Sequence, residues 1–361
     1  LDFTQPYLSA PLPEDVWLQL PNGSIVKAAR AIYGLKQSVM EWNKELKGTI
    51  LAEGWSVSDF DACLYVKRSE DGRIAVLFHY VDDITLTRNY LEEIKRMKSN
   101  LLTKYEGRNL GIPDKLVGVA ITRDEAGITL DQHFYAESIV REGMGSTEVR
   151  STSSPLNPGM DLTARRTDKE ELDQRYKPYR TILGKLMFLA GMTRPDLSNS
   201  VQELGRYAAT PCDRHWKGLQ HVLRYLAGTT KVGIHYPAGG EMDNGDLVGY
   251  GDSDWGNDTA SRQSVTGYLI LMNGAQIAWK SKMQGPVSTS SSEAKWTAMV
   301  HGMGHAIFLR GILGELGILK GYGDNRGTIQ AATTEGFNGR TRHVDIKLKC
   351  TREYVSKGFL Q

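Results

Sequence analysis

Cysteine is scarce in this 361-residue sequence, which contains only Cys63, Cys212 and Cys350. No two of them form a CxxC pair, so the pattern argues against a disulfide framework and favours a reducing, intracellular compartment. Long apolar runs are missing too. No stretch approaches the roughly 20 apolar residues that cross a membrane, and the first residues lack the charged-then-apolar pattern of a signal peptide. We therefore expect a soluble protein that is not secreted and has no membrane partner.

An excess of either charge is also missing, because 44 Lys and Arg stand against 42 Asp and Glu, a formal net charge of +2. This balance excludes a uniformly basic coat for nucleic acid, although a local basic surface stays open. With 40% hydrophobic and 24% charged residues, the chain is typical of a folded protein, and its length predicts two or three domains. It opens without methionine on what reads as the end of a strand, so we expect a piece of a longer protein.

Two segments divide the predicted elements. Residues 151–180 are rich in Ser, Pro and charge and predict a linker, and residues 236–246 form a turn cluster of Gly, Asn and Asp. Apolar spacing predicts helices over 31–55, 90–105, 180–192, 215–228, 292–316 and 345–357, and strands over 62–68, 73–88, 115–132 (a hairpin), 247–254, 266–272, 275–281 and 327–331. In the first helix the apolar positions are Leu35, Val39, Trp42, Leu46 and Ile50. The elements after residue 246 fit a compact α/β domain.

Two adjacent carboxylates interrupt the strand pattern of residues 73–88. Asp82 and Asp83 lie between β-prone residues, as at the tip of a hairpin. Carboxylates held at such a tip repel each other unless a cation lies there, and Mg²⁺ prefers oxygen ligands. Asp2 is a candidate for the third ligand of a two-metal site. From the residues alone, a plain Asp-Asp turn and a solvated aspartate near the terminus stay open as alternatives.

Four further acids lie at predicted element boundaries. Asp252 follows an apolar strand, Glu293 begins a helix after a run of serines, Asp324 lies in a Gly-rich turn, and Asp345 enters the last helix. Acids at such boundaries can converge on one cleft, as two-metal hydrolysis of a phosphodiester requires. Because scattered acids are common, four independently solvated side chains are the alternative interpretation.

Several strings, in one order along the chain, are similar to known sequences. YVDDI (80–84) looks like the central motif of reverse transcriptases. Other strings resemble stretches of the Pol polyproteins of copia-type LTR retrotransposons: LDFTQPYL (1–8), AIYGLKQSVMEW (31–42), TRPDL (193–197), VLRYLAGT (222–229), SRQSVTGY (261–268), IAWKSKMQ (277–284) and RTRHVDI (340–346). The resemblance covers essentially the whole chain.

This resemblance implies a polymerase site in the first part of the chain. Asp2, Asp82 and Asp83 match the aspartates that hold two Mg²⁺ (or Mn²⁺) ions, which activate the primer 3′-hydroxyl and steady the departing pyrophosphate. The matched nucleotide- and template-binding positions are Tyr7, Gly34, Lys36, Gln37 and Tyr80. The fingers of that family would precede Asp2, so we expect this chain alone to be a poor polymerase or none.

A second site is implied by the strings DSDW, SSSEAKW, GDNRGTI and RTRHVDI, which resemble the ribonuclease H region of the same polyproteins. The implied catalytic and metal-binding set, again with two ions, is Asp252, Glu293, Asp324 and Asp345. One departure from the family is Lys295-Trp296, where Glu-Tyr is usual. Basic residues near the end are expected to contact the phosphates of a hybrid, with a solvated helix face as the alternative: Arg340, Arg342, Lys347 and Lys349.

Together these observations predict an α+β protein of three parts. These are a truncated reverse-transcriptase palm (1–130), a largely helical thumb and connection (131–240), and a ribonuclease H-like α/β domain (241–361). The expected function is RNA-directed DNA synthesis and hydrolysis of RNA in RNA–DNA hybrids, with RNA template, DNA primer, dNTPs and other segments of the polyprotein as partners. The family resemblance implies a cytoplasmic (virus-like particle) or nuclear location. The alternatives are a fragment active only as ribonuclease H, and an inactive relic that folds and binds nucleic acid.

Overall fold

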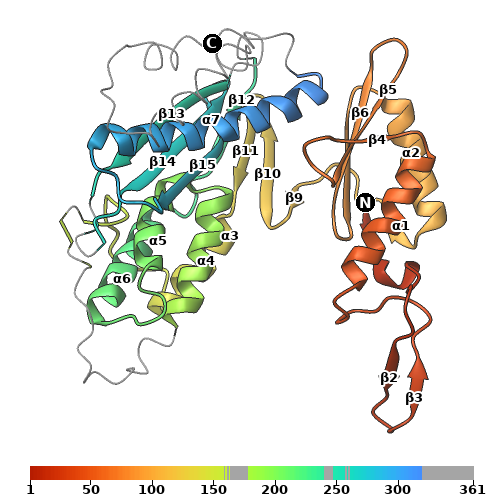
Figure 1. Ribbon diagram of the computed structural model, residues 1–361, viewed down its shortest axis with the longest axis horizontal. Coiled ribbons are helices and arrows are strands. Elements are labelled where there is room, and N and C mark those ends of the chain that lie inside the picture. Colours follow the sequence, from red (N-terminus) through yellow and green to blue (C-terminus); the bar gives the residue numbers. More distant parts are fainter. Residues whose placement is uncertain are drawn as a thin grey trace. The chain divides into compact units, whose positions relative to one another are not determined.

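The computed structural model describes residues 1–157, 159–160, 162, 178–239, 247–256, 258 and 261–318. These residues fall into two compact units. The first unit contains Leu1–Pro113 and the described residues from Arg310 onward, and the second contains the described residues of Asp114–Leu309 (Figure 1).

The first unit combines antiparallel strands with two long helices. Its elements are β1 Asp2–Phe3, a 3₁₀ helix η1 Pro6–Ser9, β2 Trp17–Gln19, β3 Ile25–Lys27, α1 Ser38–Ala52, β4 Ser56–Val57, β5 Leu64–Arg68, β6 Ile74–Tyr80, β7 Asp83–Arg88, α2 Leu91–Lys104 and β8 Gly107–Arg108. The main sheet has the order β4-β5-β6-β7-β1-β8, and β2 and β3 form a separate hairpin that projects from the rest of this unit in Figure 1.

Strand β6 is apolar at consecutive positions because side chains pack against both of its faces. Ala75 and Leu77 belong to the core under α1 and α2. Ile74 and Val76 alternate with them and pack on the other face, against Leu316 among others. A strand covered on both faces reads as a continuous apolar run.

Helix α1 confirms only part of the helix predicted from residue 31. Trp42, Leu46 and Ile50 are fully buried, as their spacing predicts, but Val39 is exposed, so its assignment to the apolar face is wrong. The helix begins late because Gly34 has a φ of 98°, in the left-handed region that a helix cannot include. The sequence string around Gly34 is therefore a loop that leads into the helix.

The second unit contains a group of helices and two sheets. Its elements are β9 Lys115–Leu116, β10 Val119–Asp124, β11 Gly127–Asp131, α3 His133–Met144, α4 Tyr179–Met192, a 3₁₀ helix η3 Pro195–Leu197, α5 Ser198–Gly205, α6 Asp213–Gly228, β12 Ile234–Pro237, β13 Leu247–Asp254, β14 Val265–Met272, β15 Ala275–Met283 and α7 Ser291–Glu315, whose last residues belong to the first unit. The sheets have the orders β12-β11-β10-β9 and β13-β14-β15.

A buried arginine joins two of the strings noted in the sequence. Arg194, 1% exposed, donates to both carboxylate oxygens of Asp196 and to the backbone oxygen of Thr229, the latter at 2.8 Å. Tyr225 also donates to Asp196, at 2.9 Å. Burying a guanidinium is costly unless it is paired and hydrogen-bonded, and these bonds join TRPDL and VLRYLAGT in one structural network.

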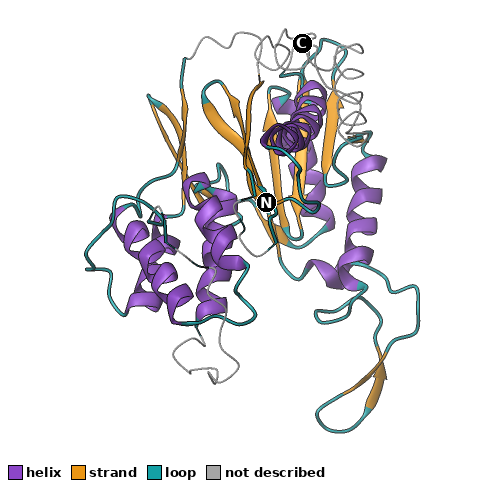
Figure 2. Cartoon of the chain, turned by 60° about the vertical axis from the view of Figure 1, so that its left-hand side comes forward, coloured by secondary structure: helices purple, strands orange, loops and turns teal. Residues whose placement is uncertain are grey.

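The sheet β13-β14-β15 is packed on both faces. Tyr268 hydrogen-bonds His305 of α7 at 2.7 Å, whereas Trp279, on the opposite face, donates to the backbone oxygen of Ala190 in α4 at 2.7 Å. Helix α7 lies along the sheet in Figure 1, and Figure 2 shows the same helix packed against the strands. The face that carries Trp279 also carries the second candidate site.

The chain has the mixed α and β class that the sequence predicts. The boundary between the units, after Pro113, lies inside the predicted palm region, and the assignment of the three regions stays a prediction. The strand predicted over 327–331 and the helix predicted over 345–357 lie outside the described residues. Among the helices that are described, none is long and apolar enough to span a membrane.

Candidate functional site

The turn between β6 and β7 carries the adjacent aspartates. Tyr80 pairs with Asp83 across the hairpin, and Val81 has a φ of 59°, a left-handed conformation that a β-branched residue rarely adopts. Such a conformation costs on the order of 1–3 kcal/mol and persists only where its surroundings impose it. Trp42 provides one such constraint, since its indole N–H donates to the Val81 backbone oxygen at 2.7 Å.

Strand β1 brings a third carboxylate to this turn. Asp2 pairs with Asp83 in the antiparallel register of β1 and β7, and with Arg108 in the register of β1 and β8. Directly opposed residues of antiparallel strands point their side chains to the same face of the sheet. Asp83, Asp2 and Arg108 therefore form a row across three neighbouring strands, with Asp82 beside it.

The electrostatics of this row show an excess of negative charge. Burial, followed by the charges of Asp82 and Asp2, raises the pKa of the Asp83 carboxyl above its ordinary value. Arg108 compensates part of the charge through an ion pair with Asp2 at 2.9 Å, but 74% of the arginine side chain is exposed. A divalent cation at this edge would relieve the remaining repulsion.

Asp2, Asp82 and Asp83 would supply some, but not all, of the ligands of a metal site. In the part of the chain that is described, no group of three or more His, Cys, Asp or Glu side chains is arranged to hold a metal ion. Mg²⁺ in nucleotide-binding sites is commonly held by one or two carboxylates, with waters and substrate phosphates completing the octahedron. Asp2, Asp82 and Asp83 match that donor chemistry.

Aromatic residues lie beside the acidic edge. Tyr7, 8% exposed in η1, packs its ring 4.5 Å from the ring of Tyr33, which is 57% exposed. Burial, then the charges of Asp82 and Tyr7, raises the pKa of Tyr33. The Tyr33 hydroxyl therefore interacts electrostatically with Asp82. Sequence reasoning missed Tyr33, although it lies inside the string AIYGLKQ.

The other predicted nucleotide- and template-binding residues lie on the same unit. Tyr80 is exposed immediately before the turn, and Lys36 is exposed in the loop before α1. Gly34 forms the turn in that loop, and Gln37 precedes α1 directly. Of these four residues, Tyr80 is adjacent to an aspartate across the hairpin, through its pairing with Asp83.

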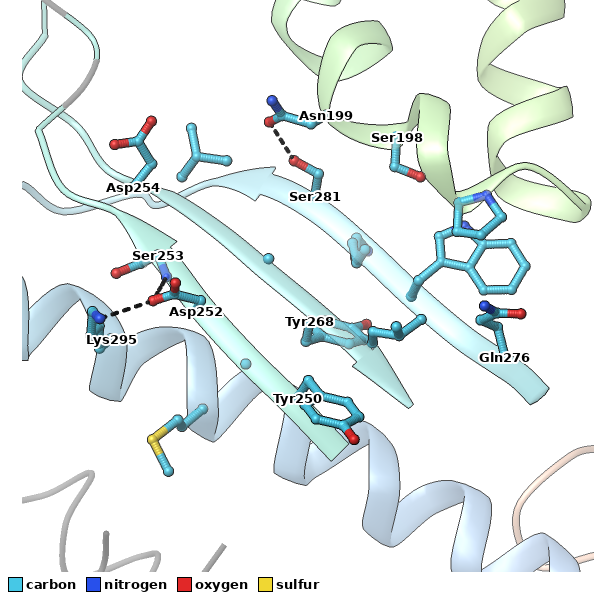
Figure 3. A pocket seen from close by; sticks show the side chains of 18 of the residues that line it. Ser198, Asn199, Tyr250, Asp252, Ser253, Asp254, Tyr268, Gln276, Ser281 and Lys295 are labelled. Atoms are coloured by element: carbon cyan, nitrogen blue, oxygen red, sulfur yellow. Dashed lines mark hydrogen bonds and ion pairs between the residues drawn. The ribbon is translucent and has the colours of Figure 1, made fainter. Parts of the chain in front are cut away.

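The second candidate site lies in a groove of about 1140 Å³ on one face of the β13-β14-β15 sheet. Residues from the start of α5 form its opposite wall, and Asn199 accepts a hydrogen bond from Ser281 across it, at 3.2 Å (Figure 3). Asp252 lines the groove with 76% of its side chain exposed. Its Oδ1 accepts from the Ser253 backbone N–H at 2.8 Å.

A lysine neutralises Asp252. The Lys295 ammonium lies 3.3 Å from Oδ1 of Asp252. The Ser253 hydrogen bond and then Lys295 lower the pKa of Asp252. The sequence shows Lys295 as a departure from the family but does not reveal its contact with an aspartate 43 positions earlier.

Glu293 has a different environment from Asp252. Its carboxylate is 5% exposed and accepts from the backbone N–H and the hydroxyl of Thr289, at 2.7 and 2.9 Å. Ser290 in turn accepts from the Glu293 backbone N–H at 3.1 Å. These bonds satisfy donors at the start of α7 that would otherwise lack helical partners. Asp252 is paired with the Lys295 ammonium, and Glu293 caps the start of α7. In this arrangement the two carboxylates are therefore poorly suited to bind a divalent ion.

The remaining predicted residues of this site cannot be placed beside these two. Asp324, Asp345, Arg340, Arg342, Lys347 and Lys349 lie outside the described residues.

Comparisons with known proteins identify the family to which this chain is related. The family profile described as Reverse transcriptase (RNA-dependent DNA polymerase) matches residues 1–158. The chain is similar to the Retrovirus-related Pol polyprotein from transposon TNT 1-94 of Nicotiana tabacum, at 28% identity over 98% of the chain and 28% of that protein. It is also similar to the Pol polyproteins from transposons RE2 and RE1 of Arabidopsis thaliana, each at 30% identity over 100% of the chain and 25% of the relative.

The class that the comparisons define is that of reverse-transcriptase-containing polyproteins. Within that class, this chain belongs to the copia-type retrotransposon Pol polyprotein family. It spans about a quarter of the length of these relatives.

Proposed function

We propose that the first unit carries the palm site of an RNA-directed DNA polymerase. The observation that carries this proposal is the row across β7 and β1, in which Asp83 faces Asp2 beside Asp82. Asp2, Asp82 and Asp83 would hold two Mg²⁺ (or Mn²⁺) ions, which supply activation of the primer 3′-hydroxyl and stabilisation of the leaving pyrophosphate. The partners are an RNA template, a DNA primer and dNTPs, together with other segments of the polyprotein.

The chain's own residues would position these partners. Trp42 fixes the strained turn through Val81, so the two aspartates keep one direction during each addition. The rings of Tyr7 and Tyr33, packed against each other at a tilt of 56°, form an aromatic wall beside Asp82, suited to pack against a sugar or base. Tyr80, exposed next to the turn, would contact the primer end.

Primer extension on an RNA template with Mg²⁺ tests the polymerase proposal. We expect Asp83→Asn to reduce extension at least about 100-fold, because several kcal/mol of charge stabilisation depend on the metal ligands. Asp71→Asn is the matched control, since Asp71 lies in the exposed turn that precedes β6. Extension that survives Asp83→Asn would refute the assignment.

A second candidate function is hydrolysis of RNA in RNA–DNA hybrids by the second unit, which would then be ribonuclease H-like. Asp252 supports it, because an exposed carboxylate on a packed strand lines the groove. A hybrid-cleavage assay tests it. Cleavage that Asp252→Asn abolishes supports the nuclease, and cleavage without primer extension supports a fragment active only as ribonuclease H. Binding of the hybrid with neither reaction supports the inactive relic.

The proposed setting follows from the family. A copia-type Pol segment is proposed to act in the cytoplasm within a virus-like particle, or in the nucleus. Fractionation of cells that express the tagged chain tests this location.

A further inference from the structure

Helix α7 packs against β13 at Gly251, and this contact determines where Lys295 lies. Gly251 precedes Asp252 in β13, and a Cβ added to it would lie 3.4 Å from the Cα of Met299. Met299 lies one helical turn after Lys295. Ala294 and Ala298 are fully buried and fix the rotation of this part of α7. The backbone thus holds Lys295 at the exposed edge of β13, next to Asp252 (Figure 3).

The ammonium of Lys295 lies where a metal ion would be repelled. Its nitrogen is 3.3 Å from Oδ1 of Asp252, and Mg²⁺ binds carboxylate oxygens at about 2.1 Å. An ion on Oδ1 would therefore lie within roughly 5.5 Å of a positive charge. In water at physiological ionic strength, repulsion between such charges lowers the affinity about fivefold.

We propose that Lys295 is a built-in counter-ion of Asp252 that competes with divalent cations for this carboxylate. The proposal rests on the suggested hydrolytic role of the second unit, because it concerns the acid on which that role depends. Lysine replaces the divalent ion electrostatically but lacks its open coordination positions, so the pair satisfies the charge without offering a Lewis acid.

Metal titration tests this competition without relying on activity. Isothermal titration calorimetry with Mn²⁺ is performed on the full chain carrying Asp2→Asn and Asp83→Asn, which silence the first unit. In this background Lys295→Gln is expected to bind Mn²⁺ about fivefold more tightly, and Lys295→Glu more tightly still, because it adds a ligand. Lys282→Gln, which removes an exposed lysine from β15 of the same sheet, is the matched control and leaves the affinity unchanged.

Adding Asp252→Asn to each variant assigns the effect to this carboxylate. The gain in affinity is expected to vanish in Lys295→Gln combined with Asp252→Asn. Unchanged affinity in Lys295→Gln, or a gain that persists without Asp252, would overturn the proposal. A thermal melt of every variant verifies folding, and Lys295→Arg, which keeps the charge, should bind like the wild type.

Hybrid cleavage measured on Lys295→Gln separates this inference from the proposed hydrolysis. Tighter Mn²⁺ binding without cleavage supports the counter-ion and refutes the nuclease. Cleavage by the chain with intact Lys295, at a metal dependence equal to that of Lys295→Gln, refutes the counter-ion and supports the nuclease.

Discussion

The two acidic regions of this protein differ in how their charge is balanced. At the β6–β7 turn, Asp83 faces Asp2, and Arg108 compensates only from the far side of the row. In the groove of the second unit, Asp252 meets Lys295 directly. The first region keeps negative charge that an added cation can neutralise, whereas the second already contains its cation. Matching carboxylates to a family motif therefore identifies the positions of a metal site but not its readiness to bind metal.

The largest effect is expected at the first region. Asp2→Asn should lower primer extension at least about 100-fold, because it removes the carboxylate that faces Asp83. Asp15→Asn is the control, since Asp15 is an exposed aspartate paired with Lys27, and it should leave extension unchanged. Equal extension by Asp2→Asn and the wild type would show that β1 does not belong to the site.

The next largest effect on primer extension is expected when the β6–β7 turn loses its hydrogen bond from Trp42. Trp42→Phe removes the donor to Val81 and should destabilise the protein by about 1–2 kcal/mol while lowering extension roughly tenfold. Trp55→Phe also loses a buried indole hydrogen bond, to Glu93 at 3.0 Å, but should affect only stability. Urea unfolding and primer extension, measured together, distinguish the two. Similar extension by both variants would contradict the positioning role of Trp42.

A smaller effect, on Mn²⁺ affinity, compares Arg108 of the first region with Lys295 of the second. Arg108→Gln should raise the Mn²⁺ affinity of the first region only about threefold, less than Lys295→Gln in the second. Arg108 pairs with one of three acids and is highly exposed, so its removal changes the local charge proportionally less. Calorimetric titration in an Asp252→Asn background measures this. A larger gain for Arg108→Gln than for Lys295→Gln would reverse the comparison.

The smallest effect is a dependence of stability on pH. Because the folded pKa of Asp83 is raised, the folded state favours the protonated carboxyl, and the stability this contributes is present below the ordinary value of 3.8. It is lost as the pH rises through the folded pKa. Urea unfolding should therefore show Asp83→Asn gaining stability over the wild type as the pH rises through this range, and Mg²⁺ should reduce the gain. A pH-independent difference would mean that the charge of Asp83 is already compensated.

Local patterns in the sequence predict many of the elements. The apolar run of β6 and β7 interrupted at Asp82 identified the hairpin, and helical spacing identified the buried Trp42. Both features are local in sequence, where period and turn chemistry act directly. The family resemblance, rather than a local pattern, implies that Asp2 is a third acid, and the register of β1 and β7 places Asp2 opposite Asp83.

Contacts between distant residues could not be derived in this way. The hydrogen bond from Trp42 to Val81 joins residues 39 positions apart, and the ion pair of Lys295 with Asp252 joins α7 to β13, two elements that are distant in the sequence. The role of Glu293 as a helix cap could be suspected from the serines before it, yet its burial depends on tertiary packing. These contacts, rather than the presence of the acids, decide how each site behaves.

One titration tests the central difference most directly. Mn²⁺ binding is compared calorimetrically between the wild type, Asp83→Asn and Asp252→Asn under the same conditions. Asp83→Asn is expected to remove the tightest Mn²⁺ binding, and Asp252→Asn is expected to leave it nearly unchanged. Loss of the tightest binding in Asp252→Asn, with Asp83→Asn like the wild type, would contradict the proposed difference between the two regions.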